Sequence, residues 1–346
     1  MQDKGPQETA RISTCLVTGG AGFIGSHVAE CLVDTGHRVV VLDDLSGGYR
    51  ENVPSEACFV EGSILDHALI DSLFQEHGFD HVYHLAAYAA EGLSHFIKRF
   101  NYNNNVIGSV NLINAAVNYC SKTFVFTSSI AVYGAGQTPM TEEMIPVPRD
   151  SYGIAKLAIE QELRVCREMF GLNYVIFRPH NVYGERQNIG DRYRNVVGIF
   201  MNQLLKGEPM TVFGDGEQSR AFTHIIDVAP IIAASGNQLA ARNQVFNIGS
   251  DDPFTVNHLA KVVATAMGKE CKVRHLDSRN EVKHAFSDHT KVERIFPSQA
   301  KTSLEDGIRA MVEWVKLHGA RESEVFRGIE IASKLPPSWA MAPTRK

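Results

Sequence analysis

Two hydrophobic patterns alternate along roughly residues 11–128 and continue to about residue 178. Short apolar runs are typical of strands that are buried on both faces of a parallel sheet. Longer stretches in which apolar residues recur every three or four positions are typical of amphipathic helices. The patterns predict strands at 15–17, 38–42, 57–61, 81–85, 124–126 and 174–178, and helices from residue 23 and over 66–77, 96–119 and 152–170. This order predicts an α/β fold with a doubly wound, Rossmann-type parallel sheet.

Beyond residue 178 the alternation is looser and predicts a smaller lobe. Helices are expected over 195–206, 227–240, 255–267 and 303–318, and strands over 210–213, 244–248 and 272–276. We therefore expect a sheet domain over 11–178, to which later segments return, an α/β lobe over 179–318, and a C-terminal helix or tail over 319–346. Within this last part, residues 336–346 are expected to form an exposed tail.

Composition and charge narrow the range of partners. The 346 residues are 44% hydrophobic and 21% charged, as in an ordinary globular protein, and the formal net charge of −5 argues against a nucleic-acid-binding surface. No apolar run reaches the roughly 18 residues that span a bilayer, and the polar start of the chain is unlike a signal peptide. We expect no nucleic-acid partner, no membrane partner and a cytoplasmic location.

Two residue types that often bind metals are expected to be structural. The six cysteines lie far apart without a Cys-x-x-Cys pair, which predicts reduced, buried thiols. His81 and His84 lie three positions apart on a predicted strand, so their side chains point to opposite faces. We therefore predict no metal site.

A glycine-rich turn follows the first predicted strand. Gly19, Gly22 and Gly25 stand at the spacing GxxGxxG, directly before a predicted helix. Glycine lets the backbone approach a pyrophosphate, which the N–H groups and the dipole of the helix then bind. The second strand ends at Asp43, 18 residues after Gly25, where a carboxylate accepts hydrogen bonds from ribose hydroxyls and repels a 2′-phosphate. The pattern predicts NAD rather than NADP; the alternative is a turn that serves only helix–strand packing.

A tyrosine and a lysine begin the helix predicted over 152–170. Tyr152 and Lys156 lie four positions apart and so share one face of a helix. A free tyrosine has a pKa of about 10, whereas a catalytic base works best near about 7, and a neighbouring ammonium favours the phenolate. Ser129 follows a central strand, at the edge where parallel sheets bind ligands. The three residues predict a catalytic group; the alternative is a tyrosine packed on the helix beside a solvated lysine.

Four segments resemble the extended short-chain dehydrogenase/reductase family in their order and spacing: TGGAGFIGS, Asp43, TSSIAVYG and YGIAK. Three later segments resemble its sugar-nucleotide branch, namely Arg178–Gly184, Gly214–Arg220 and Thr223–Val228, and the similarity extends to about residue 318. The resemblance implies tightly held NAD in the sheet domain and a nucleotide-diphosphate sugar as substrate in the lobe. It also implies a homodimer in which helices near 103–118 and 153–170 pair with their copies.

The resemblance also implies a role for individual residues. Ser129 binds the sugar hydroxyl that is oxidised, Tyr152 takes its proton, and Lys156 lowers the tyrosine pKa and holds the nicotinamide ribose. Tyr152, Lys156 and the following residues are expected to bind NAD: Gly19, Gly22, Phe23, Ile24, Gly25, Asp43, Asp44, Ser46, Gly47, Ser63, Ile64, Leu85, Ala86, Ala87, Tyr88, Asn105, Ser128, Arg178 and His180. Ser129, Tyr152 and the following residues are expected to bind the substrate: Asn181, Asn195, Val196, Arg220 and Arg279.

The family branch contains 4-epimerases, 4,6-dehydratases, decarboxylases and 3,5-epimerases, which differ in the fate of a 4-keto sugar. Dehydratases carry Asp-Glu, decarboxylases a Glu and 3,5-epimerases a Cys at places that Ile130 and Ala131 occupy here. The resemblance therefore implies inversion of C4 of a UDP-sugar, such as UDP-glucose, UDP-galactose, an N-acetyl form or UDP-glucuronate. The small Ala285 implies room for a larger sugar substituent. A 4,6-dehydratase, a UDP-glucuronate decarboxylase and a non-enzymatic NAD-binding sensor are the alternatives.

Overall fold

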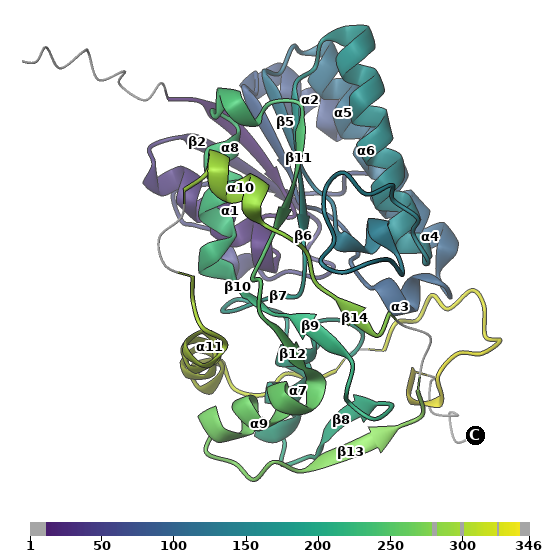
Figure 1. Cartoon of the computed structure of the whole chain (residues 1–346). Coiled ribbons are helices and arrows are strands. Elements are labelled where there is room, and N and C mark those ends of the chain that lie inside the picture. Colours follow the sequence, from purple (N-terminus) through teal and green to yellow (C-terminus); the bar gives the residue numbers. More distant parts are fainter. Residues whose placement is uncertain (1–11, 279–281, 298–300, 324, 340–346) are drawn as a thin grey trace, which may run out of the picture.

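A seven-stranded parallel sheet forms the centre of the larger domain (Figure 1). The computed structural model describes residues 12–278, 282–297, 301–323 and 325–339. The sheet has the strand order β11-β6-β5-β4-β1-β2-β3. Its strands are β1 (Thr14–Thr18), β2 (Arg38–Asp43), β3 (Cys58–Glu61), β4 (His81–His84), β5 (Thr123–Thr127), β6 (Tyr174–Pro179) and β11 (Gln244–Ile248). All neighbouring pairs are parallel, so the carboxyl ends of all seven strands lie at one edge.

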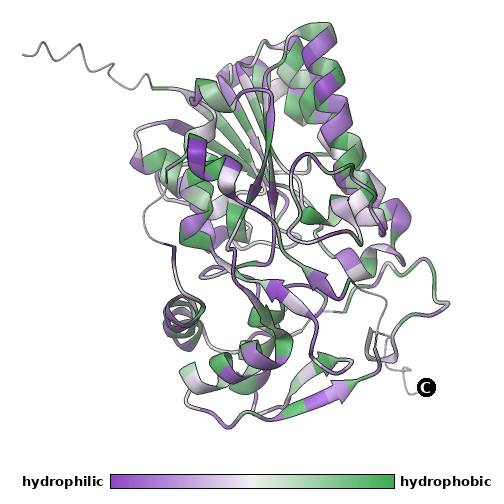
Figure 2. Ribbon diagram, viewed as in Figure 1, coloured by the Kyte–Doolittle hydropathy of each residue, from purple (hydrophilic) through white to green (hydrophobic). Residues whose placement is uncertain are grey.

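Helices cover both faces of the sheet, which explains its unbroken apolar runs. One face packs against α1 (Phe23–Asp34), α8 (Ala229–Ser235) and α10 (Thr290–Ile295). The other face packs against α2 (His67–His77), α5 (Gly108–Asn118) and α6 (Ser151–Phe170). Figure 2 agrees with this arrangement, because strands rich in hydrophobic residues lie between helices that carry both hydrophobic and hydrophilic residues. Strand order reverses between β1 and β4, and such a switch point opens a crevice for ligands at the carboxyl edge.

The smaller lobe lies below this carboxyl edge (Figure 1). Its core is formed mainly by α7 (Val196–Leu205), α9 (Val256–Ala266) and α11 (Leu304–His318). Its short strands are β7 (Val182–Tyr183), β8 (Met210–Phe213), β9 (Ser219–Ala221), β10 (Thr223–His224), β12 (Pro253–Thr255), β13 (Val273–Leu276) and β14 (His284–Ala285). They pair as β7 with β10, β8 with β13, and β9 between β12 and β14.

Two predicted helices differ in the structure. The single helix expected over 96–119 is divided into α4 (Lys98–Tyr102), a π-helical turn (Asn103–Ile107) and α5, preceded by the short α3 (Glu91–Ser94). A π turn adds a residue to the helical cycle without ending the helix, so the hydrophobic period alone did not reveal it. The helix expected over 227–240 ends at Ser235. There Gly236 packs so closely on Tyr83 that an added Cβ would lie 2.4 Å from its hydroxyl oxygen.

The expected exposed tail is wrong at its start, because Trp339 is only 3% exposed. Residues 340–346 lie outside the described residues. The expectation that the cysteines are all buried is also wrong. Cys58 opens the edge strand β3, Cys120 follows α5 and Cys271 precedes β13, and these three are exposed. All six cysteines are free thiols, as expected.

The histidines of β4 are both buried and have hydrogen-bond partners within the protein. His84 is hydrogen-bonded to Thr18 Oγ1 (2.8 Å) and Ser109 Oγ (2.7 Å), and His81 to Asn237 Oδ1 (3.0 Å) on the opposite face. Among the described residues, no group of three His, Cys, Asp or Glu side chains is arranged to hold a metal ion.

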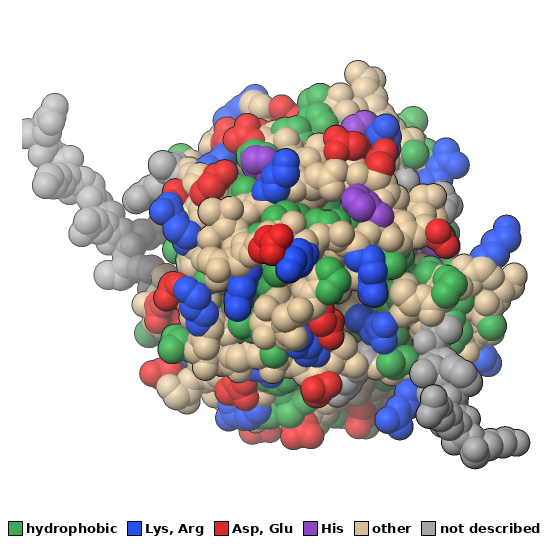
Figure 3. Space-filling model, turned by 90° about the horizontal axis from the view of Figure 1, so that it is seen from below, with side chains coloured by type: hydrophobic (Ala, Val, Ile, Leu, Met, Phe, Trp, Pro, Cys, Tyr) green, Lys and Arg blue, Asp and Glu red, His purple; other side chains and the backbone are tan. Residues whose placement is uncertain are grey.

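The surface of the smaller lobe carries charges of both signs. Figure 3 shows Lys and Arg side chains interspersed with Asp and Glu over this face. A mixed surface differs from the basic stripe typical of nucleic-acid-binding proteins. Within the part of the chain that the structure describes, no helix has both the length and the hydrophobicity to span a membrane.

Candidate active site

One large cavity, with a volume of about 830 Å³, lies between the carboxyl edge of the sheet and the smaller lobe. Its sheet side is formed by the ends of β1, β2, β4, β5 and β6, which contribute Gly19, Asp43, Leu85, Thr127 and Pro179. Its lobe side includes residues 193–197 and 211–213, together with Gln218, Arg220 and Phe222. The cavity therefore joins the predicted dinucleotide turn to the predicted substrate residues.

The glycine turn is a backbone cradle that tolerates no side chain at Gly19 or Gly25. Gly19 has φ +72°, and a Cβ there would lie 2.6 Å from the Ala86 nitrogen; a Cβ on Gly25 would lie 2.1 Å from the Gly19 oxygen. α1 begins at Phe23 with Gly22 as its N-cap, which offers no side chain to the first backbone N–H groups. Those groups are available to a pyrophosphate, and the helix dipole favours its negative charge. The cradle thus fits the diphosphate of NAD.

Asp43 lies at the end of β2, next to this cradle. Its Oδ2 accepts a hydrogen bond from the Ala21 nitrogen (3.0 Å) and its Oδ1 from the Leu45 nitrogen (2.8 Å). Burial raises the pKa of Asp43, and these backbone hydrogen bonds oppose the rise. The two bonds fix the carboxylate at the cavity wall, where it suits the adenosine ribose hydroxyls and opposes a 2′-phosphate.

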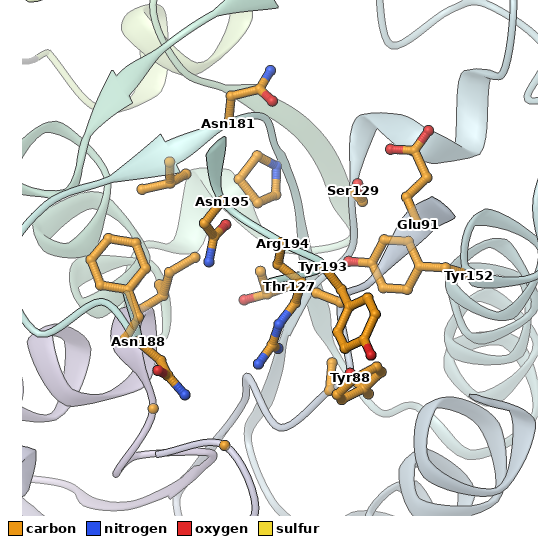
Figure 4. A pocket seen from close by; sticks show the side chains of 18 of the residues that line it. Tyr88, Glu91, Thr127, Ser129, Tyr152, Asn181, Asn188, Tyr193, Arg194 and Asn195 are labelled. Atoms are coloured by element: carbon orange, nitrogen blue, oxygen red, sulfur yellow. The ribbon is translucent and has the colours of Figure 1, made fainter. Parts of the chain in front are cut away.

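The predicted catalytic residues come together at the inner end of the cavity (Figure 4). Asp150 caps α6 by accepting a hydrogen bond from the Gly153 nitrogen (2.8 Å), which places Tyr152 in the first turn. The Tyr152 side chain lies beside Ser129 (Figure 4), close enough for the serine hydroxyl to influence the pKa of the tyrosine. Lys156 Nζ donates to the Thr127 carbonyl (2.8 Å) and lies 5.8 Å from the centre of the Tyr152 ring. The arrangement holds a phenol, a hydroxyl and an amine around one point.

The pKa of Tyr152 is shifted in the direction opposite to the one expected for a catalytic base. Burial raises the pKa of Tyr152 well above its ordinary value, and the hydrogen bond from Ser129 is the largest opposing influence. Burial lowers the pKa of Lys156 to about 7, while Glu160 opposes that change. Near neutral pH the amine is therefore only partly charged, and the protein alone does not make the phenol acidic. That Lys156 acidifies Tyr152 stays a prediction for the complex with NAD.

A buried ion pair lies next to the catalytic residues and is hydrogen-bonded to the loop that carries Ser129. Arg178 and Glu160 are 1% and 0% exposed, and they bind through two hydrogen bonds of 2.9 and 2.5 Å. The same carboxylate accepts a hydrogen bond from Ser128 Oγ (2.6 Å). Because Ser128 precedes Ser129, the pair fixes the loop that follows β5.

Four residues expected to bind NAD directly do not line the cavity. Asn105, Arg178 and His180 are at most 3% exposed and bind other protein groups, while Ser63 Oγ accepts a hydrogen bond from the Leu65 nitrogen. His180 is hydrogen-bonded to the Ala221 carbonyl (3.1 Å) and to His289 (3.0 Å). The remaining predicted NAD-binding residues do line the cavity.

The predicted substrate residues lie on the lobe side of the cavity. Asn181 and Asn195 have positive φ values of 42° and 63°, which turn the backbone at the cavity wall, and Val196 begins α7. Arg220 also lines the cavity, and its guanidinium donates to the carbonyls of Ser219, Val282 and Lys283. Arg279 lies outside the described residues. Ala285 is buried against Val132 and Met140 and does not line the cavity, so the inference of room for a substituent there is wrong.

Several lining residues were missed at the level of sequence. In Figure 4, Glu91 extends beside Ser129 and Tyr152, and Arg194 lies near Tyr88 and Tyr193. Arg194 was detectable as the neighbour of the predicted Asn195, but Glu91 has no local pattern that marks it. The other lining residues missed include Arg149, Asn188, Phe213 and Gln218.

Comparisons with known proteins agree with this geometry. A model of the NAD dependent epimerase/dehydratase family matches residues 15–249. The structure resembles a UDP-glucose 4-epimerase from Thermotoga maritima, solved with UDP-glucose, with 36% identity, a TM-score of 0.84, and coverage of 88% of this chain and 99% of that one. It also resembles a UDP-glucose 4-epimerase from Thermus thermophilus in complex with NAD, with 32% identity, a TM-score of 0.83, and coverage of 88% and 99%. A curated relative from Bacillus cytotoxicus, a UDP-N-acetyl-alpha-D-glucosaminuronate decarboxylase, is 31% identical over 319 residues, which are 87% of this chain and 97% of the relative.

Proposed function

The chain belongs to the NAD-dependent epimerase/dehydratase family, and from this premise we propose that it inverts C4 of a UDP-sugar through a transient 4-keto intermediate. The observation that carries the proposal is the meeting of Ser129, Tyr152 and Lys156 at the junction of a dinucleotide cradle and a substrate lobe. A catalytic group at this junction is what oxidation and reduction of one sugar carbon requires.

The protein residues divide the work of the reaction. NAD, when bound, supplies the acceptance and return of a hydride. Ser129 forms a hydrogen bond with the C4 hydroxyl of the sugar. Tyr152 takes the proton of that hydroxyl as general base during oxidation and returns it as general acid during reduction. Lys156 in its charged form favours the phenolate, and the Thr127 carbonyl holds the amine in place. For inversion, the sugar must present its opposite face, so the nucleotide end has to be held more firmly than the sugar.

The nucleotide end has suitable residues for that grip. Arg220 and Arg194 line the lobe side of the cavity, and a guanidinium offers a planar fork of N–H groups to phosphate oxygens. Asn181 and Asn195 add amide groups on the same side. We propose that these residues bind the diphosphate and nucleoside, while the sugar lies towards Tyr152.

A dehydratase or decarboxylase of the same family is the second candidate, and one observation favours it. Glu91 lies beside Ser129 and Tyr152 (Figure 4), and it is close enough to influence the tyrosine electrostatically. A carboxylate there could serve as an extra acid or base. Against this, Ile130 and Ala131 offer no such group, and Ala131 is 8% exposed.

Product analysis of a panel of substrates separates the two candidates. The protein is incubated with UDP-glucose, UDP-galactose, UDP-N-acetylglucosamine and UDP-glucuronate, and the products are followed by NMR. Epimerisation predicts interconversion of C4 epimers that Tyr152→Phe abolishes and Glu91→Gln retains. Release of water or carbon dioxide from the sugar, with loss of that activity in Glu91→Gln, would establish the second candidate instead.

We also propose that the protein is a homodimer. The side of the domain formed by the π turn and α6 exposes several large apolar side chains, although solvent usually faces polar ones. They are Ile107 (50% exposed), Ile154 (46%), Val165 (50%), Met169 (69%) and Phe170 (64%). Pairing of this side with a second copy would bury them. Light scattering at micromolar concentration should give the mass of two chains, and the mass of one chain would refute the dimer.

We propose a cytoplasmic location on the basis of the cysteines. All six are free, three of them exposed, which suits a compartment that keeps thiols reduced. Fractionation of cells that express the tagged protein tests this proposal, and recovery with a membrane or secreted fraction would contradict it.

A further inference from the structure

The chain after α11 turns back across the cavity side of the molecule. We call residues 325–339 the C-terminal strap; in Figure 1 it is the yellow segment that passes beside α3. The strap lies beyond residues 15–249, which match the family model. It is irregular apart from a short 3₁₀ turn, Pro337–Trp339, yet it contacts both domains.

The strap first binds the start of α4. Glu330 Oε2 accepts a hydrogen bond from the Arg99 nitrogen (3.0 Å), and Oε1 accepts one from the Phe100 nitrogen (3.1 Å). The Glu330 and Ile331 nitrogens both donate to the Phe96 carbonyl, at 2.8 and 3.2 Å. These bonds satisfy N–H groups that a helix start leaves unpaired, and the carboxylate complements the helix dipole. They lower the pKa of Glu330.

The next link runs from α4 to the catalytic helix and to Tyr88. Asn101 Nδ2 donates to the Ser151 carbonyl (2.8 Å), directly before Tyr152. Asn105, in the π turn, accepts from the Tyr88 nitrogen (3.0 Å) and donates to the Tyr88 carbonyl (3.3 Å). Asn105 also donates to Asn101 Oδ1 (2.8 Å), so the two amides form one buried unit.

Aromatic contacts form a second route from the strap to the cavity wall. Phe326 lies against Tyr88, with ring centres 5.5 Å apart, and its nitrogen donates to the Tyr193 hydroxyl (3.0 Å). Tyr88 in turn supports the Arg194 guanidinium, whose carbon is 4.9 Å from the ring centre. Tyr88, Tyr193 and Arg194 all line the cavity.

Trp339 completes this route at the end of the strap. It is 3% exposed and makes edge-to-face contacts with Tyr193 (5.5 Å between ring centres) and Phe213 (6.2 Å). Arg192 fixes the adjoining backbone by donating to the Ser338 carbonyl (2.6 Å). Edge-to-face pairs favour defined ring orientations, so Trp339 orients two residues of the cavity wall rather than merely covering them.

We propose that the C-terminal strap is a positioning element for the nucleotide-sugar half of the site, and that Trp339 is its key residue. The proposal rests on the proposed function for the identity of the substrate. Trp339 holds Tyr193 and Phe213, and Tyr193 adjoins Arg194 and Asn195, so its loss lets the substrate wall relax. The diphosphate and ribose part of the NAD site is built from β1, α1 and β2 across the cavity, whereas Tyr88, also expected to bind NAD, contacts the strap through Phe326. Loss of Trp339 is therefore expected to weaken the binding of the substrate far more than the binding of NAD.

The test compares Trp339→Ala, Trp339→Leu and Trp339→Phe in the full-length protein, with Ser333→Ala as a control on an exposed part of the strap. Affinities for UDP and for NAD are measured by calorimetry, and KM and kcat are measured with the sugar that the wild type converts. Trp339→Ala is expected to weaken UDP binding and raise KM at least tenfold, with NAD affinity and kcat changed less than threefold. Trp339→Phe is expected to restore most of the loss, and Ser333→Ala to match the wild type.

Two outcomes overturn the proposal: unchanged UDP affinity in Trp339→Ala, or an equal loss of UDP and NAD affinity. If Trp339→Ala does not fold, Trp339→Leu, which keeps an apolar side chain without the ring, is judged by the same ratio. The UDP measurement needs no turnover. A wild-type protein that binds UDP but converts none of the sugars would count against the proposed function. The role of the strap would still be tested by the UDP and NAD affinities of the variants.

Discussion

Glu160 binds Arg178 in a buried ion pair, one helical turn beyond Lys156 on α6. The pair has hydrogen bonds of 2.9 and 2.5 Å, and Glu160 also accepts one from Ser128. Its charge opposes the loss of the Lys156 proton. One carboxylate therefore links the charge of the catalytic lysine to the position of the serine loop.

Removing one partner of this pair is expected to destabilise the fold strongly. Glu160→Gln leaves the Arg178 guanidinium buried without its counter-charge, which costs about 3–5 kcal/mol of unfolding free energy. Glu160→Met combined with Arg178→Met removes both charges and should recover much of that loss. Urea denaturation measures both variants. A loss below about 1 kcal/mol in Glu160→Gln would show that the pair contributes little.

Lys156 is expected to make stability depend on pH. Burial lowers its pKa from 10.5 to about 7, so between these values the unfolded chain holds a proton that the folded chain has released. Stability contributed by this group therefore rises with pH from about 7 and levels off near 10.5. Relative to Lys156→Met, the wild type should gain up to about 1.4 kcal/mol per pH unit in this window. Parallel stability curves for the two proteins between pH 7 and 9 would contradict the burial effect.

Asp251 is expected to make stability depend on pH in the acidic range. Its hydrogen bond with His289 (2.5 Å), and then its contact with Lys301, hold its pKa well below the ordinary value. The contribution is complete above the unfolded pKa of about 3.9 and is lost as pH falls through the folded pKa. Because the side chain is half exposed, Asp251→Asn should cost only about 1 kcal/mol at pH 7. Denaturation at pH 7, 5 and 3 checks this, and the difference from wild type should shrink below about pH 4.

The choice of dinucleotide is expected to depend on Asp43. Charge-assisted hydrogen bonds contribute roughly 1.5–3 kcal/mol each, so Asp43→Asn should weaken NAD binding by at least about tenfold. Adding Asp44→Arg provides a guanidinium for a 2′-phosphate and should shift preference towards NADP. Calorimetric titration of both dinucleotides measures the effect. Equal NAD affinity in wild type and Asp43→Asn would place the adenosine elsewhere.

Local sequence predicted the parts of the molecule whose geometry is itself local. The strands of the sheet were predicted within one or two residues because a doubly covered strand has an unbroken apolar centre, as between the end residues of Arg38–Asp43. Gly19 and Gly25 were marked because no side chain fits there. Tyr152 and Lys156 were marked because helical spacing alone places them on one face.

Long-range packing accounts for what sequence reasoning missed. Arg178 and His180 stand in a motif associated with the cofactor, yet Glu160 and His289 bind them below the cavity wall. Trp339 was assigned to an exposed tail because its partner Tyr193 lies 146 positions earlier in the chain. Glu91 lies on a four-residue helix whose position depends on contacts with α6. A single sequence contains no periodicity that reports such contacts.

The central claim is that one hydrogen is transferred from C4 of the sugar and returned to the same carbon without exchange with solvent. The most direct measurement is NMR of the products formed from UDP-glucose, or another sugar of the panel, in D₂O. The account predicts the C4 epimer with hydrogen retained at C4 and C5, and no product in Tyr152→Phe. Deuterium at C4 or C5, or a product that has lost water or carbon dioxide, would contradict it.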